Sequence, residues 1–553
     1  MNAKDLIRRA ESLENDRSNF KNEWQEIANY FRPIKSDITI TKAEGDKSNF
    51  KKLFESSPIN SVHELKSIII GTLFNRAIKP IQIESEIEEI NENDNVRDWI
   101  SEFTKVLLNQ LFNSKSNFER AFSEATADDI VFGTMLTLIE EGKNHPLKYT
   151  TINIKNFLIA ENEENVVDYV IIKDKKTARQ IMDKWGNNKE ANISDKIRKA
   201  AEKEPFKVFD LQLHIMPRKE RERNKIDLLN KEIAGYWVDV NNTLIIEELG
   251  WDNLPFAVGR SEKASNEVYG TSRCMMALAD ARQINEMSKQ INEATEIILK
   301  PSLVVNTAFK NRISLRAGAL NYIEDKRELA PGQRAIEQIG NIGNIPINEN
   351  LLARKQENIK EIFFLDKLKV FDDARATATQ IMEIRAESLR IMGDFIFSNI
   401  DYLDQLLNVS FDILFKKIYF QNENGQYVLL QNNGLFQKEL PKELISNPSL
   451  KIRYQNPITQ SQRMNEAVAI EKLVSYVVNI AQSNPEILDV LDFDEIVRTY
   501  SDILNVDPDL IKNPVVVEQI RQLRQQQMQM QQQLDQEQQA IQAAAIGRKS
   551  EII

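Results

Sequence analysis

The chain has 553 residues, of which 42% are hydrophobic and 28% are charged, and its formal net charge at pH 7 is −11. This length predicts about three to four domain-sized units, and the balance of apolar and charged residues excludes wholesale disorder. The acidic balance is unlike that of proteins that grip nucleic acid tightly.

Apolar runs in this sequence, such as residues 68–70 and 515–517, are far too short to cross a bilayer, so we expect no membrane segment. The single cysteine, Cys274, excludes an internal disulfide and a cysteine-based metal site, and we interpret it as a small core residue. The three histidines are widely separated and lack zinc-ligand spacing. We therefore expect no metal and no cofactor.

Apolar residues at helical spacing predict the first elements of the chain. One helix is expected from Leu6 to Phe31, where Pro33 ends the pattern, and a second from Asn60 to Ile78. A third is expected over Phe118–Ile139, with its last part open to a strand instead.

Between Leu147 and Val258 the pattern changes to short alternating or apolar runs rich in β-branched residues. This pattern predicts the strands of a sheet, interrupted by one helix near Lys176–Lys184. The run PRKERERNK, residues 217–225, is the densest basic cluster, but Glu220 and Glu222 interleave it. A solvated loop or hairpin is therefore favoured there over a DNA site.

The segment from Gly270 to Lys300 is predicted as one helix of about 45 Å, ended by Pro301. Its apolar positions include Cys274, Leu278 and Ala281. On pattern alone, a helix of an ordinary bundle with a solvated outer face is favoured for this segment. The polar positions between the apolar ones are Arg282, Asn285, Lys289, Asn292, Glu293 and Glu296.

Glycine and proline punctuate residues 301–348, which predicts short strands and turns. A shorter helix over residues 351–363 and the loop LKVFDDARA follow. The longest helical pattern then runs from Thr377 to Tyr419, about 65 Å, and begins with a capping box formed by Thr377 and Gln380.

The C-terminal part begins with a short strand, predicted over Gln426–Leu430, in an otherwise irregular stretch up to Pro457. Residues 458–520 are predicted as helices rich in Leu, Val and Ile. The glutamine-rich tail after them is open to two interpretations, a helix that packs against copies of itself or a disordered polar segment.

Motifs of enzymes are missing from this sequence. It contains no GxxxxGK[ST], GxGxxG or GxSxG pattern. Asp372 and Asp373 are an adjacent acidic pair beside Phe371, but a two-metal nuclease would need further acidic ligands. We predict a protein that is not an enzyme. A large helical scaffold or adaptor, which binds protein rather than DNA, is one candidate of this kind.

The order of the elements from Gly270 to Tyr419 resembles the stem, clip, tunnel loop and spine helix of portal proteins. The local sequence resembles one branch, the head-to-tail connectors of short-tailed, podovirus-like bacteriophages, over roughly residues 5–550. The similar stretches are RAESLENDRSNFKNEWQEIANYFRP, SVHELKSIIIGTLFNRAIKP, SNFERAFSEATADDIVFGTMLTLIEE, YGTSRCMMALADARQINEMSKQ, LRAGALNYI and RATATQIMEIRAE.

The resemblance implies a mainly helical α+β fold that assembles as a ring of twelve copies around a DNA channel. The parts it implies are an N-terminal wing over residues 1–265, a first stem helix over 266–300, a clip over 301–348, a second stem helix over 349–366, a tunnel loop over 367–376, a long spine helix with a wing return over 377–457, a crown over 458–520, and a tail over 521–553 that is open to a barrel helix.

The resemblance also implies partners and a location. The partners are double-stranded DNA in the channel, the terminase large subunit, the tail adaptor and tail tube proteins, and the major capsid and scaffolding proteins. The location is the portal vertex of the virion capsid, and the host cytoplasm during assembly.

Two groups of residues follow as candidate sites. A solvated connection between helices is the ordinary interpretation of residues 367–376, but the resemblance assigns Lys367, Lys369, Phe371 and Arg375 to the channel. An ordinary surface hairpin is the alternative for residues 301–348, whose candidate docking residues are Lys310, Arg312, Arg316, Lys326, Arg327 and Arg334.

Overall fold

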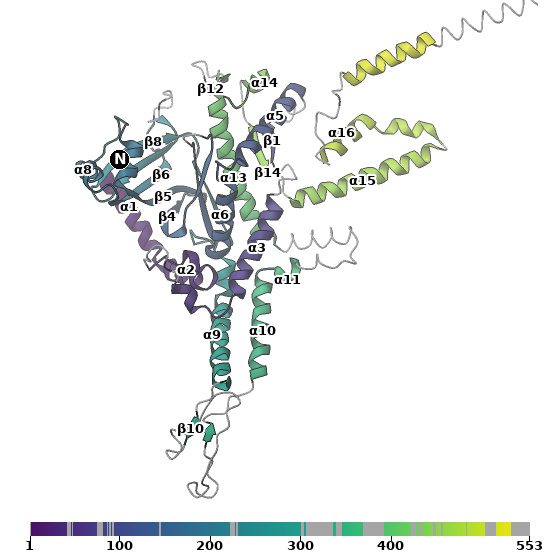
Figure 1. Ribbon diagram of the computed structural model, residues 1–553. Coiled ribbons are helices and arrows are strands. Elements are labelled where there is room, and N and C mark those ends of the chain that lie inside the picture. Colours follow the sequence, from purple (N-terminus) through teal and green to yellow (C-terminus); the bar gives the residue numbers. More distant parts are fainter. Residues whose placement is uncertain are drawn as a thin grey trace, which may run out of the picture. The chain divides into compact units, whose positions relative to one another are not determined.

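Figure 1 shows the computed structural model of the chain, which divides into two compact units, one of residues 1–75 and 109–415 and one of residues 76–108 and 416–553. Each unit is considered by itself. The structure describes residues 2–40, 46, 48–74, 81–85, 87, 90, 93–142, 145–221, 227, 230–299, 303–305, 336–338, 345–368, 392–421, 427–430, 434–445, 450–454, 457–482, 484–503, 512 and 516–531.

The first unit begins with two helices, α1 (Ala3–Asp16) and α2 (Ser18–Phe31), where the periodicity predicted one. The prediction of a continuous helix was wrong because the chain breaks at Arg17. The buried Arg17 guanidinium donates to the carbonyl oxygens of Ile154 and Phe157, each at 2.7 Å. The break lets α1 pack on strand β4 (Phe157–Glu161) while α2 packs on helices α6 (Phe118–Phe132) and α9 (Arg273–Leu299).

A five-stranded antiparallel sheet follows, with its strands in chain order. The apolar side of α1, including Leu6 and Ala10, packs on buried residues of this sheet such as Val238 and Ile171. The predicted sheet is confirmed. Its strands are β4 (Phe157–Glu161), β5 (Val167–Thr177), β6 (Val208–Pro217), β7 (Ile233–Asp239) and β8 (Leu244–Trp251).

Two short helices connect β5 to β6. The predicted helix is α7 (Ala178–Trp185), which begins with a capping box between Thr177 and Gln180, and the sequence pattern missed α8 (Asp195–Lys203). The β6–β7 connection contains the described part of the basic run. There Arg218 pairs with Glu248 and Arg221 with Glu232, each at 2.6 Å, so two basic side chains of the run are neutralised within the fold.

A smaller sheet in the order β3-β2-β9 completes the first unit's β structure, with β2 (Thr134–Glu140), β3 (Lys148–Thr151) and β9 (Phe256–Arg260). Helix α6 (Phe118–Phe132) leads directly into β2, so the change from helix to strand expected before Ile139 occurs at Gly133. Helix α3 (Ser57–Leu73) packs against α6.

Helix α13 (Gly393–Ile418) is the described part of the long helix predicted from Thr377. Residues 369–391, including the predicted capping box, lie outside the described residues. The Tyr402 hydroxyl donates to Thr137 Oγ1 on β2 at 2.6 Å, which ties α13 to the small sheet.

Three segments of the first unit meet at Gly133, which ends α6, and Gly270, which precedes α9. A Cβ on Gly133 would lie 2.4 Å from the carbonyl oxygen of Gly270, and Gly133 has a φ of +71°. The Ser261 N–H, just after β9, donates to the carbonyl oxygen of Gly133 at 3.0 Å. This meeting point, which we call the glycine junction, therefore tolerates only glycine at its centre.

Asp129 lies at the glycine junction and is fully buried. Its carboxylate accepts hydrogen bonds from Ser261 Oγ at 2.8 Å and from Asn399 Nδ2, on α13, at 3.1 Å. Burial raises the pKa of Asp129 from 3.8 to about 6, although these hydrogen bonds oppose the increase.

The second unit includes most of helix α5 (Asp94–Leu111), which the periodicity did not reveal, and a two-stranded sheet of β1 (Ile81–Ser85) and β14 (Leu450–Tyr454). Trp99 on α5 donates through Nε1 to the Tyr419 hydroxyl at 2.9 Å and stacks on Phe103. The predicted strand near residues 426–430 is β13 (Tyr427–Leu429), paired with β12 (Tyr419–Gln421).

The C-terminal helices of the second unit are α14 (Lys442–Ile445), α15 (Pro457–Ala481), the 3-10 helix η8 (Pro485–Val490) and α16 (Phe493–Ile503), followed by a helix over residues 516–531. The predicted helical region after residue 458 is confirmed, and residues 516–531 favour the helical interpretation of the start of the tail. Within the described residues, no helix has the length and apolar character needed to span a membrane.

Replacing Gly133 with alanine is expected to lower the free energy of unfolding by about 2–4 kcal/mol, since the new Cβ meets backbone atoms at a left-handed position. The matched control is Gly71→Ala in α3, where a Cβ has nothing within 4 Å and alanine should stabilise by about 0.5–1 kcal/mol. Urea unfolding of both variants measures the contrast, and equal midpoints would contradict the tight junction.

Replacing Asp129 with asparagine is expected to remove one pH-dependent part of stability. Because the pKa of Asp129 is raised in the folded state, the protonated carboxyl contributes fully to the free energy of unfolding below about pH 4. This contribution is lost as the pH rises through about 6. The pKa difference corresponds to about 3 kcal/mol. Between pH 4 and 7, the urea midpoint of Asp129→Asn should therefore improve relative to the wild type. Parallel midpoints across this range would show that the buried carboxyl does not titrate there.

Candidate functional site: the paired stem helices

Helices α9 (Arg273–Leu299) and α10 (Ile345–Ile362) lie side by side and point away from the sheets of the first unit (Figure 1). The 27 residues of α9 make a rod of about 40 Å. The chain between them contains β10 (Leu303–Val305) and β11 (Ile336–Gln338), which pair antiparallel. These strands agree with the short strands predicted within residues 301–348.

Helix α9 has a buried side and a polar exposed side. Cys274, Ala277, Ala281 and Ile284 are fully buried, which confirms Cys274 as a core residue. Of the polar positions expected on the outside, Asn285 and Lys289 are only partly exposed. The exposed positions include a polar stripe of Gln283, Glu286, Gln290 and Glu293. The Lys289 ammonium lies within 4.0 Å of the carboxylates of Glu286 and Glu293.

A short segment before α3 holds the two stem helices together. The Phe54 N–H donates to Asn285 Oδ1 on α9 at 2.8 Å, and Asn285 Nδ2 donates back to the carbonyl oxygen of Lys52 at 3.3 Å. The Glu55 carboxylate accepts from Ser288 on α9 and from Gln356 on α10, each at 3.2 Å. We call residues 52–57 the stem clamp.

Several hydrogen-bond donors stabilise the negative charge of Glu55. Burial alone would raise its pKa, but hydrogen bonds from the side chain and backbone of Ser57, from Ser288 and from the Ser56 backbone hold the pKa below its usual value. The clamp therefore keeps its negative charge at neutral pH. No sequence pattern indicates this role, because Glu55 and Gln356 are 301 positions apart.

Ion pairs add to the contacts around the stem. Lys355 on α10 pairs with Asp280 on α9 at 2.7 Å, and Arg282 on α9 pairs with Glu26 on α2 at 2.6 Å. The second pair is half exposed, so its contribution to stability is small and its main effect is to set orientation.

Helix α10 ends in a sharp turn. Phe364 has a φ of +58°, and the Arg273 guanidinium lies 4.7 Å from the centre of its ring. Phe363 is fully buried and stacks on Phe31 of α2 at 6.0 Å. The turn leads the chain into α11 (Leu365–Leu368). The contacts of Phe363 with α2 and of Phe364 with α9 fix the end of α10.

The structure describes only one of the candidate site residues that the sequence predicted. Lys367 lies on α11, and nothing is described of its side chain. Lys369, Phe371 and Arg375 lie outside the described residues, as do Lys310, Arg312, Arg316, Lys326, Arg327 and Arg334. Their proposed roles stay predictions.

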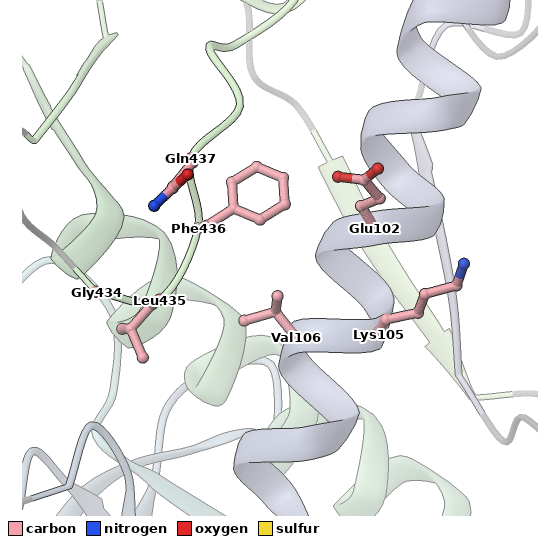
Figure 2. Close-up of a pocket in the computed structure, with 7 residues that line it drawn as sticks. All are labelled: Glu102, Lys105, Val106, Gly434, Leu435, Phe436 and Gln437. Carbon is pink, nitrogen blue, oxygen red and sulfur yellow. The ribbon is translucent and has the colours of Figure 1, made fainter.

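An open pocket of about 370 Å³ lies in the second unit between α5 and the segment after β13 (Figure 2). Its lining residues are Glu102, Lys105, Val106, Gly434, Leu435, Phe436 and Gln437. Glu102 is already paired with Lys438 at 2.6 Å, so its charge is partly satisfied at the pocket edge. The described residues also contain no cluster of His, Cys, Asp or Glu side chains suited to a metal. The pocket therefore gives no support for catalysis.

Comparison with known proteins identifies the chain. It matches the family model for the bacteriophage head to tail connecting protein over residues 3–422 and 427–511. It is 22% identical to a protein named "Portal protein" from Salmonella phage epsilon15, covering 98% of this chain and 93% of that relative. It is also 22% identical to a "Probable portal protein" from Bordetella phage BPP-1, covering 98% and 92%. The resemblance seen in the sequence is thereby confirmed, and the chain belongs to the bacteriophage head to tail connecting protein family.

Proposed function

We propose that twelve copies of this chain close into a ring at one capsid vertex and form the channel through which double-stranded DNA is packaged and ejected. The paired stem helices carry this proposal. A rotation that repeats one interface closes a ring, and rods packed side by side around the axis then form a wall. The clamp and the Lys355–Asp280 pair stiffen α9 and α10 into such a rod.

The exposed stripe of α9 suits a wall that DNA must pass without sticking. Duplex DNA carries one negative charge for about every 1.7 Å of its axis, and a basic wall would bind it. The stripe offers two glutamines and two glutamates, with Lys289 beside both glutamates. Twelve copies would carry a formal charge of 12 × (−11), or −132. Such a ring repels the duplex on average.

A few basic groups would then centre the DNA in the channel. The tunnel loop, residues 367–376, carries Lys367, Lys369 and Arg375 together with Phe371. It follows the turn at Phe364, which is packed against the first unit, so the loop starts from a fixed point. In the proposed ring, the loop projects into the channel and contacts the DNA backbone.

The clip, residues 301–348, would dock first the terminase large subunit and later the tail adaptor and tail tube proteins. It follows the far end of α9 and precedes α10, and it carries the basic residues Lys310, Arg312, Arg316, Lys326, Arg327 and Arg334. The wing would face the major capsid and scaffolding proteins. Assembly would take place in the host cytoplasm, and the finished ring would remain at the portal vertex of the virion.

Purified chain is expected to form rings with a central hole, since the ring follows from one repeated interface. Native mass spectrometry should give twelve times the mass of the single chain, and negative-stain images should show the hole. A compact monomer under every condition, or a scaffold-like assembly without a hole, would contradict the proposed channel.

Neutralising the tunnel loop with Lys367→Ala, Lys369→Ala and Arg375→Ala should reduce packaged or retained DNA several-fold, because the proposed basic contacts with the duplex are removed. Ring assembly should be unchanged by mass. The control is a triple alanine variant of Lys196, Lys199 and Lys203, which are exposed on α8. Loss of rings in the loop variant alone would show that the loop is structural, and equal DNA content in both would exclude the DNA contact.

A further inference from the structure

Helix α15 carries an uncovered apolar stripe in the second unit. The stripe is formed by Ala469, Leu473, Tyr476 and Ile480, which recur at four, three and four residues and so share one side of the helix. Leu473 is 49% exposed and Tyr476 is 65% exposed. We call this set the α15 stripe.

The covered side of α15 is a different one. The helix packs against η8 and α16 of its own chain (Figure 1). A second series, Ile470, Val474, Val477 and Ala481, is less exposed and is shifted by one position from the α15 stripe, and Val477 is buried. A helix with two adjacent apolar seams packs well only when it has a neighbour on each.

A second uncovered stripe lies on η8 and α16 of the same unit. Val490 is 78% exposed, Phe493 39% and Val497 57%. Phe493 and Val497 lie one turn apart on α16, and Val490 is the last residue of η8, separated from α16 by the extended residue Leu491. We call these three residues the α16 stripe. The two stripes are chemically alike but lie on different elements, so they are not equivalent surfaces.

We propose that the α15 stripe of one copy of this chain packs against the α16 stripe of the next copy. This inference rests on the proposed ring. In a ring made by rotation, each copy presents one surface to one neighbour and a different surface to the other. Two non-equivalent apolar surfaces on one unit match that requirement, and an exposed apolar patch on a soluble protein marks an interaction site.

Charges beside the stripes favour a second copy in this arrangement. Lys472 and Glu466 are both exposed beside the α15 stripe, so the charges there balance, whereas Asp492, Asp494 and Glu495 are exposed around the α16 stripe. Asp494 pairs with Arg521 of the helix over residues 516–531, at 2.5 Å. The α16 stripe facing itself across a twofold axis would bring like charges together, which is unfavourable. The α15 stripe facing the α16 stripe brings Lys472 toward acidic side chains.

Disulfide trapping in the full chain tests this pairing directly. Tyr476→Cys and Val497→Cys place thiols on the two stripes at exposed positions, and the native Cys274 is fully buried, so it adds no surface thiol. Oxidation of the double variant should give a ladder of covalent oligomers on a non-reducing gel. A mixture of the two single variants should give covalent dimers and nothing larger.

Each single variant alone should stay monomeric on the gel, because two identical stripes do not meet. Dimers of a single variant, or a double variant that closes only within one chain, would overturn the proposed pairing. Absence of every crosslink in particles seen as rings would overturn it as well. In that case the ring would stand and the interface would lie elsewhere, whereas absence of rings in the wild type would remove the proposed function itself.

A charge substitution gives a second measurement. Tyr476→Glu should reduce the ring fraction at a fixed concentration at least tenfold in native mass spectrometry, because the carboxylate would be buried against apolar residues. Ser475→Glu is the matched control, since it adds the same charge to an exposed position on another side of α15. Equal ring fractions for the two variants, with unchanged helical content by circular dichroism, would overturn the proposal.

Discussion

Two backbones pass so closely at Gly133 and Gly270 that a methyl group on either would overlap the other. Around this contact, α6 ends, β9 ends and α9 begins, and Asp129 receives donors from both Ser261 and α13. Helix α9 therefore starts from a point fixed by three other elements. The direction of α9 within the first unit depends on this small, tightly packed centre.

The stem clamp holds α9 and α10 together. Glu55 keeps its charge because hydrogen bonds from Ser57, Ser288 and the Ser56 backbone hold its pKa low, and two of its hydrogen-bond donors, Ser288 and Gln356, belong to α9 and α10. Two helices that are separated along the chain by residues 300–344 thus behave as one rod. Membership of the head to tail connecting family makes this chain a structural protein rather than an enzyme, as the missing enzyme motifs predicted.

Regular periodicity predicted much of the fold correctly. The sheet of the first unit, α9 and the change from α6 to β2 followed from apolar spacing, because each element covers a core with one side. The break at Arg17 could not be predicted from this spacing, since the carbonyl oxygens that accept the hydrogen bonds of Arg17 lie 137 and 140 positions away. The pairing of β1 with β14 and the clamp at Glu55 were missed for the same reason. The tunnel-loop and clip residues came from the family resemblance, because charge in a loop does not reveal what it faces.

The pairing of β1 with β14 has a consequence for how the chain is made. Ile81 lies opposite Tyr454, so the partner of an early strand emerges from the ribosome only after most of the protein has been synthesised. The five-stranded meander joins neighbours in sequence and can form long before that moment. A truncated chain would carry the folded five-stranded sheet in its first unit and an unpaired β1 in its second, and such an unpaired edge is prone to aggregate. The pairing of β1 therefore waits until almost the whole chain has been synthesised.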